Sequence, residues 1–222
     1  MLFKFFNPED TRYYWGPILE DSFPSEKVAF HTDPFFAECR AYGRIKEAQD
    51  RGILKREIAI PCLGYILLPD EHRRILEESG IDLQEDCLDG ADTEPHTPEA
   101  TNGLRRVRAI VKELASQDSG VNTKSIGKIL GDIKQLNELG IYHRDIRRHN
   151  FKDGKLVDFG SAWTEPHCFM HSADTEEPGE TRLGDLVMFD NMVDLERIKT
   201  TVRAMPNSSY CKKLRSNSGT HA

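Results

Sequence analysis

The order of hydrophobic and polar positions along the chain predicts several strands. Leu2–Phe6 is a continuous apolar run of strand length. Residues 58–68 form a β-rich run that Pro61 and Gly64 interrupt, which predicts two short strands at a sheet edge or a tight turn between them. Apolar residues at every second position from 107 to 111, with basic residues around them, predict a half-buried strand.

Helices are predicted where apolar positions recur every three or four residues. Asp33 and Pro34 supply an N-cap and a first-turn proline for the first of these helices. The second covers about residues 123–139 and stops at Gly140, and a last helix covers about residues 183–198. The expected class is therefore α+β.

Glu38 falls on the apolar face of the first predicted helix. A buried carboxylate is costly unless a cation pairs with it, so Glu38 predicts a lysine partner from elsewhere in the chain. Lys4 lies in a strand-like run, Lys27 lies nearer in the sequence, and a lysine upstream of Met1 is a third possibility. We favour Lys4, with residues 11–32 as an insertion.

Composition and charge narrow the class of protein. The formal net charge of −7 weighs against nucleic-acid binding, which rests on basic residues. No apolar run approaches the roughly 20 residues that span a membrane, so we expect no membrane partner and a cytoplasmic or nuclear location. Residues 69–103 are acidic and read as a solvated, partly helical insertion, and residues 207–222 as a flexible tail.

The five cysteines are scattered and include no C-x-x-C pair, which argues against a disulfide framework or a zinc ribbon. His167 and Cys168, together with His171, have a spacing that zinc ligands can adopt. No fourth ligand is evident in the sequence, so we interpret this segment as a loop.

Two motifs carry chemistry, and they occur in a fixed order after the second helix. Residues 143–150, HRDIRRHN, match the catalytic loop of protein kinases, and Asp158-Phe159-Gly160 matches their metal-binding D-F-G. A short hairpin through Asp153-Gly154 is expected between them. The order and context of the two motifs predict a protein-kinase-like domain.

The kinase resemblance implies a role for each matching residue. Asp158 and Asn150 would bind Mg²⁺ through oxygen atoms, while Asp145 would orient the acceptor hydroxyl and Arg147 would contact the transferring phosphate. Lys4, held by Glu38, would anchor the phosphates of ATP. The backbone of Glu113 and Leu114 would meet the adenine. His143 and Phe159 are expected to be packing residues.

Other parts of a kinase are missing from the chain. Only three residues precede Lys4, so no glycine-rich loop precedes it in this sequence. Either the sequence begins late, or the protein does not close over a nucleotide in the usual way. No A-P-E follows D-F-G. We therefore expect a two-lobed fold with a reduced N-lobe over residues 1–114 and a truncated C-lobe over residues 115–206.

Three phrases resemble a filamentous-fungal family related to a kinetochore-complex subunit with a kinase-like core. They are residues 7–17, NPEDTRYYWGP, residues 33–44, DPFFAECRAYGR, and residues 156–167, LVDFGSAWTEPH. The kinase motifs predict a protein that binds ATP and Mg²⁺ and transfers phosphate to a protein or small-molecule hydroxyl. The alternative is a catalytically inactive adaptor in a fungal kinetochore complex, with protein partners.

Overall fold

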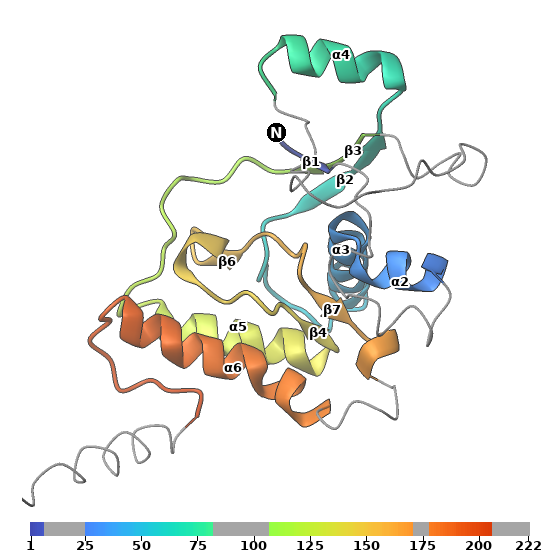
Figure 1. Cartoon of the computed structure of the whole chain (residues 1–222). Coiled ribbons are helices and arrows are strands. Elements are labelled where there is room, and N and C mark those ends of the chain that lie inside the picture. The colour runs from blue at the N-terminus through green and yellow to red at the C-terminus, as the bar shows by residue number, and fades with distance from the viewer. Residues whose placement is uncertain (7–24, 82–106, 171–177, 206–222) are drawn as a thin grey trace, which may run out of the picture.

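The computed structural model describes residues 1–6, 25–81, 107–170 and 178–205 of the chain. They form one three-stranded sheet, two two-stranded sheets and several helices (Figure 1), so the predicted mixed α+β class is confirmed. The later part of the acidic insertion, the tail from 207 and His171 lie outside the described residues. None of the described helices is long and apolar enough to span a membrane.

The three-stranded sheet is antiparallel, with the strand order β1-β3-β2. The strand predicted at the N-terminus is confirmed as β1 (Leu2–Phe6), and β2 (Cys62–Leu67) lies at the opposite edge. Ala59, which precedes β2, forms a parallel bridge with Leu156. Only the second half of the β-rich run 58–68 therefore joins this sheet.

The central strand β3 (Arg108–Lys112) corrects one prediction from the sequence. We expected a half-buried strand, but Arg108 is 2% and Lys112 is 3% exposed, so the basic residues are as buried as the apolar ones. Each basic side chain has an acidic partner on or next to the helix that covers the sheet. Arg108 Nη2 lies 2.8 Å from Asp33 Oδ2, and Lys112 binds Glu38.

Helix α3 (Pro34–Asp50) covers one face of the sheet, where Phe35 packs against Phe6 and Ile110. Asp33 is its N-cap as predicted, because Asp33 Oδ1 accepts a hydrogen bond from Phe35 N at 2.8 Å. The other carboxylate oxygen of Asp33 binds Arg108. Asp33 thereby links the first residues of α3 to the central strand β3.

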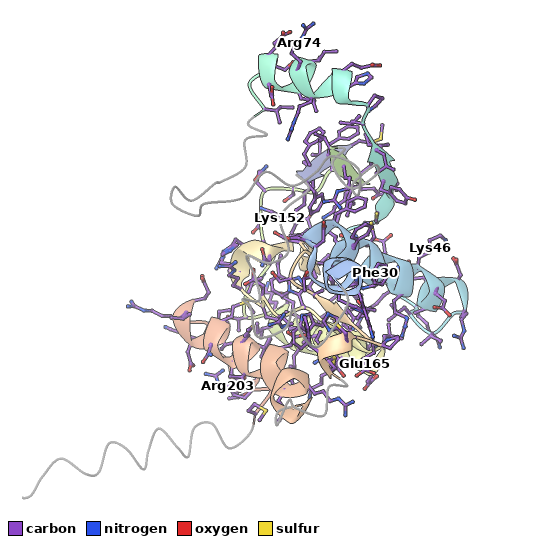
Figure 2. The ribbon with its side chains drawn as sticks, turned by 45° about the vertical axis from the view of Figure 1, so that its right-hand side comes forward. Phe30, Lys46, Arg74, Lys152, Glu165 and Arg203 are labelled. Atoms are coloured by element: carbon purple, nitrogen blue, oxygen red, sulfur yellow. The ribbon has the colours of Figure 1, made fainter. Side chains whose placement is uncertain are left out.

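The remaining helices are α2 (Ser25–Thr32), α4 (Asp70–Glu78), α5 (Ile126–Glu138) and α6 (Pro178–Leu195). Helices α5 and α6 correspond to the second and last predicted helices, and Gly140 follows α5 with a φ of 71°. Helix α4 falls within the predicted acidic insertion and extends beyond the sheet (Figure 1). Figure 2 shows Arg74 of α4 and Arg203, which follows α6, at opposite ends of the molecule.

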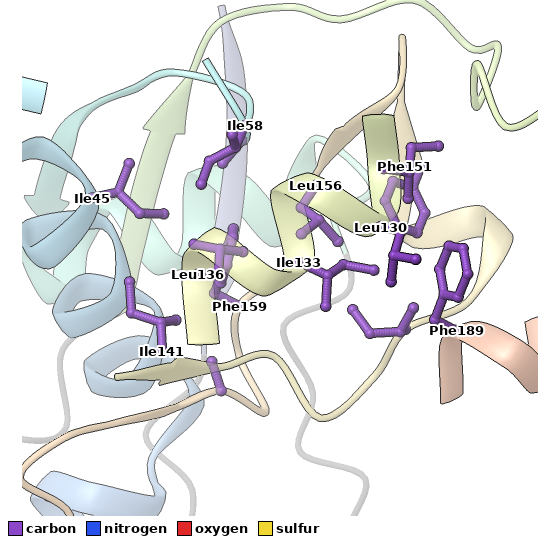
Figure 3. Close-up of a cluster of buried hydrophobic side chains, with 14 of the residues drawn as sticks. Ile45, Ile58, Leu130, Ile133, Leu136, Ile141, Phe151, Leu156, Phe159 and Phe189 are labelled. Atoms are coloured by element: carbon purple, nitrogen blue, oxygen red, sulfur yellow. The ribbon is translucent and has the colours of Figure 1, made fainter. Parts of the chain in front are cut away.

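The main core forms around α5. Its apolar stripe includes Ile133 and Leu136, each 1% exposed, and these pack with Ile45 of α3 and Phe189 of α6 (Figure 3). Short elements connect α5 to α6. They are β4 (Ile141–Tyr142), η3 (Arg148–Asn150), β5 (Phe151–Lys152), β6 (Lys155–Leu156), β7 (Trp163–Thr164) and η4 (Cys168–Met170).

Candidate functional site

Two lysines and two carboxylates meet where α3 faces β1 and β3. Lys4 Nζ lies 2.9 Å from Glu38 Oε2 and 2.5 Å from Asp158 Oδ1. Lys112 Nζ binds the other oxygen of Glu38. We call these four residues the Glu38 cluster. The cluster has two positive and two negative charges, so its net charge is zero. Glu38 itself is fully buried.

Of the two lysines considered from the sequence, Lys4 pairs with Glu38. Lys27 lies in α2 and is exposed. The second partner, Lys112, was missed because it was assigned to the alternating pattern of a half-buried strand. A carboxylate has two oxygens and can accept from two cations, but the sequence does not indicate which distant residue supplies the second one.

The pKa values of Lys4 and Asp158 reflect their mutual pairing. Burial lowers the pKa of Lys4, but the charges of Glu38 and Asp158 together outweigh that effect and raise it above its ordinary value. Burial raises the pKa of Asp158, whereas the charge and hydrogen bond of Lys4 bring it below its ordinary value. Both groups are therefore charged at neutral pH, which keeps the ion pair intact.

The predicted catalytic-loop residues form a second hydrogen-bonded group. Asn150 Nδ2 donates to Asp145 O at 2.9 Å and to Asp145 Oδ2 at 2.8 Å. Arg147 Nη2 donates to the same carboxylate oxygen at 2.5 Å. Both amide hydrogens of Asn150 are thus used within the loop, and its amide oxygen is the atom left for a metal.

The hairpin β5–β6 brings the two motifs together. It turns at Asp153 and Gly154, as predicted, with φ values of 52° and 70°. Val157 N donates to Asn150 O at 3.0 Å, so Asn150 and Asp158 leave the hairpin at the same end. Asp158 has a φ of 60°, a left-handed conformation that is uncommon for a non-glycine residue.

Asp185 of α6 binds the backbone at the start of the 143–150 segment. Its carboxylate accepts hydrogen bonds from His143 N at 2.8 Å and Arg144 N at 2.7 Å. Asp185 is 1% exposed, and burial raises its pKa above the ordinary value even though the two backbone N–H groups oppose that shift. Sequence reasoning did not single out Asp185, because its partners lie about 40 residues earlier.

His143 and Phe159 are fully buried, which confirms their expected packing role. The His143 ring lies 4.9 Å from the Phe159 ring, edge to face, and His143 Nε2 lies 2.9 Å from Val157 O. Phe159 also contacts the ring of Tyr42 on α3 at 5.2 Å. These ring contacts join residues 143–150, residues 158–160 and helix α3, which carries Glu38.

Glu113 and Leu114 begin the connector that follows β3. Glu113 N donates to Pro61 O at 3.0 Å, and the Leu114 side chain is 72% exposed. Their expected contact with an adenine stays a prediction.

The model of one protein family, the kinetochore Sim4 complex subunit FTA2, matches residues 1–163. The chain belongs to this family. The span matched by the FTA2 family model contains the Glu38 cluster, Asp145 and Asn150, and it ends before His167 and Cys168. Comparisons with curated proteins and with solved structures found no match.

Proposed function

We propose that this chain is a non-catalytic, protein-binding subunit of a kinetochore complex in the nucleus. The observation that carries the proposal is its membership of the FTA2 family of kinetochore Sim4 complex subunits. On this proposal the kinase-like features serve as a rigid framework, and the protein partners are other members of the complex.

The contacts around Glu38 support a kinase-like framework. In protein kinases a lysine pairs with a helical glutamate, and the D-F-G aspartate lies next to the phosphates. Lys4, Glu38 and Asp158 have this relationship, and Asp145 with Asn150 corresponds to the catalytic loop. The two-lobed arrangement, with lobes over residues 1–114 and 115–206, is part of this proposal.

The charge balance of the site favours the adaptor over the enzyme. Asp158 Oδ1 binds Lys4, and Asp145 Oδ2 accepts from both Arg147 and Asn150. A divalent cation would have to compete with Lys4 for Asp158, and an acceptor hydroxyl would have to compete with Arg147 for Asp145. The carboxylates needed for phosphoryl transfer are therefore already engaged within the chain.

A second candidate function is the binding of ATP with Mg²⁺. It is favoured by the half-exposed side chain of Asp158, which is 49% exposed, and by the amide oxygen of Asn150. These are hard oxygen ligands of the kind that Mg²⁺ prefers. Lys4 would bind the phosphates, and Mg²⁺ would neutralise their charge when bound.

A thermal-unfolding titration with ATP and MgCl₂ separates the two candidates. A ligand that binds only the folded state raises Tm in proportion to the logarithm of its concentration. The adaptor proposal expects no shift beyond that of MgCl₂ alone. A magnesium-dependent shift that Asp158→Ala abolishes and that Asp50→Ala, at an exposed residue of α3, retains would instead support nucleotide binding.

The adaptor proposal is tested directly by the location of the protein in its native cells. A fluorescent fusion is expected to mark kinetochores, and the double variant Asp145→Ala, Asp158→Ala is expected to do so equally well. Loss of the kinetochore signal in the folded double variant, or its absence in the wild type, would contradict the proposal.

A further inference from the structure

A second group of chemically active side chains lies between α2 and η4, apart from the Glu38 cluster. His31 comes from the last turn of α2, and His167 and Cys168 lie at the start of η4. One ligand atom from each residue lies within 4.8 Å of the other two. Zinc ligands in a tetrahedral site lie about 3.5 Å apart. Small side-chain rotations that move each ligand atom by about 1 Å would therefore place the three atoms around one ion.

The three side chains are almost completely removed from solvent. His31 is 8%, His167 is 1% and Cys168 is 8% exposed. Within the part of the chain that the structure describes, His31 Nδ1 is buried and has no hydrogen-bond partner. A buried nitrogen with a lone pair or proton and no partner is unusual in a folded protein and needs an explanation. A metal ion in this position would provide the missing partner.

The surroundings of His167 restrict the orientation of its ring. Its Nε2 lies 3.3 Å from His31 O, and its Nδ1 accepts a hydrogen bond from Phe169 N at 3.4 Å. Metal-bound histidines usually donate one ring N–H to a carbonyl and coordinate through the other nitrogen. In His167, Nε2 would keep its contact with His31 O, and a metal at Nδ1 would replace the long hydrogen bond from Phe169 N. Trp163 stacks on the His167 ring at 4.5 Å and an interplanar angle of 16°, which further restricts its rotation.

We propose that His31, His167 and Cys168 form a zinc site that fastens α2 to η4. On binding, the Cys168 thiol releases its proton to solvent and the thiolate forms a bond to Zn²⁺, while the two imidazoles bind through neutral nitrogens. A water molecule takes the fourth position. The Cys168 thiol is free, so no disulfide competes with the metal.

The charged groups near these ligands are cations. Lys27 acts on His31 and Cys168, and Arg144 acts on His167. Arg40 is a third cation, and its guanidinium donates to Phe30 O and to His31 O. These two hydrogen bonds keep the Arg40 guanidinium beside the backbone carbonyls of α2. The negative charge of the Cys168 thiolate would offset part of the positive charge of the metal.

Sequence reasoning considered His167, Cys168 and His171 as zinc ligands and did not include His31. His31 and His167 are separated by 136 residues, and no local spacing rule connects them. His171 lies outside the described residues. The third ligand became visible only when the fold placed α2 against η4.

The test uses the purified full-length chain after treatment with a chelator. Titration with CoCl₂ is expected to give the charge-transfer absorption of a cobalt–thiolate bond, and ZnCl₂ is expected to remove it. One equivalent of zinc should remain with the protein through gel filtration. The variants His31→Ala and Cys168→Ser are expected to weaken zinc binding at least tenfold, and Cys168→Ser is expected to lose the charge-transfer band.

Matched controls are Cys39→Ser and His72→Ala, which change the same residue types elsewhere in the chain and should bind as the wild type does. Circular dichroism of the metal-free variants checks that they fold. The wild-type titration decides the question even if a variant does not fold. Absence of a charge-transfer band in the wild type, or its survival in Cys168→Ser, would overturn the proposal.

Discussion

Replacement of Glu38 by alanine is expected to lower the free energy of unfolding by about 3 to 5 kcal/mol, the range for removal of one partner from a buried ion pair. Glu38 is fully buried, and its two oxygens bind Lys4 and Lys112. Its loss leaves Lys112 as a buried charge without its partner carboxylate, because that lysine is only 3% exposed. Urea denaturation followed by circular dichroism measures the change.

The matched control is Glu47→Ala on the same helix. Glu47 is 57% exposed and pairs with Arg51 at 3.3 Å, so its loss is expected to cost less than about 1 kcal/mol. The double variant Glu38→Met, Lys112→Met removes both charges and should recover much of the stability. Equal effects of Glu38→Ala and Glu47→Ala would show that Glu38 is not the buried partner of these lysines.

Replacement of Asp185 by alanine is expected to cost about 3 kcal/mol or more, because each of its two hydrogen bonds is made to a charged acceptor and such bonds contribute about 1.5 to 3 kcal/mol. The backbone N–H groups of His143 and Arg144 would lose their acceptor. Arg144 also has a φ of 63°, a conformation that needs support from its surroundings. Hydrogen exchange at residues 143 and 144 and urea denaturation measure the effect.

Asn191→Ala is the control for this prediction, since Asn191 is an exposed residue on the same helix. Its effect is expected to stay within about 0.5 kcal/mol, as for most surface changes. Faster exchange at residues 143 and 144 should occur in Asp185→Ala alone. Unchanged exchange in that variant would mean that α6 does not hold residues 143 and 144 in place.

Local signals allowed much of the fold to be predicted. The N-cap Asp33, the apolar stripe of α5 and the Asp153-Gly154 turn each depend on residues that are close in the sequence, and the structure has all three. The pairing of Glu38 with Lys4 was also accessible, because a buried carboxylate requires a cation and Lys4 lies in a strand.

Contacts between distant residues limited what could be predicted of the site. Arg108 and Lys112 look like solvent-facing positions of an alternating strand, yet their partners Asp33 and Glu38 lie 75 and 74 residues earlier. Charge alone cannot distinguish a solvated basic residue from one that is buried against a distant acid. The same limit applies to His31 and to Asp185, whose partners are set by the packing of helices.

The two lysines on either side of Glu38 restrict how α3 can move. Rotation of this helix away from the sheet would break both ion pairs in one step and leave Glu38 and Lys112 without partners, since Lys4 keeps Asp158, so intermediate positions are energetically unfavourable. A helix held in this way has a single resting orientation. The surface that α3 presents to other subunits would then be the same in the free and the bound protein. Any regulation of their binding would have to act at the contact surface itself.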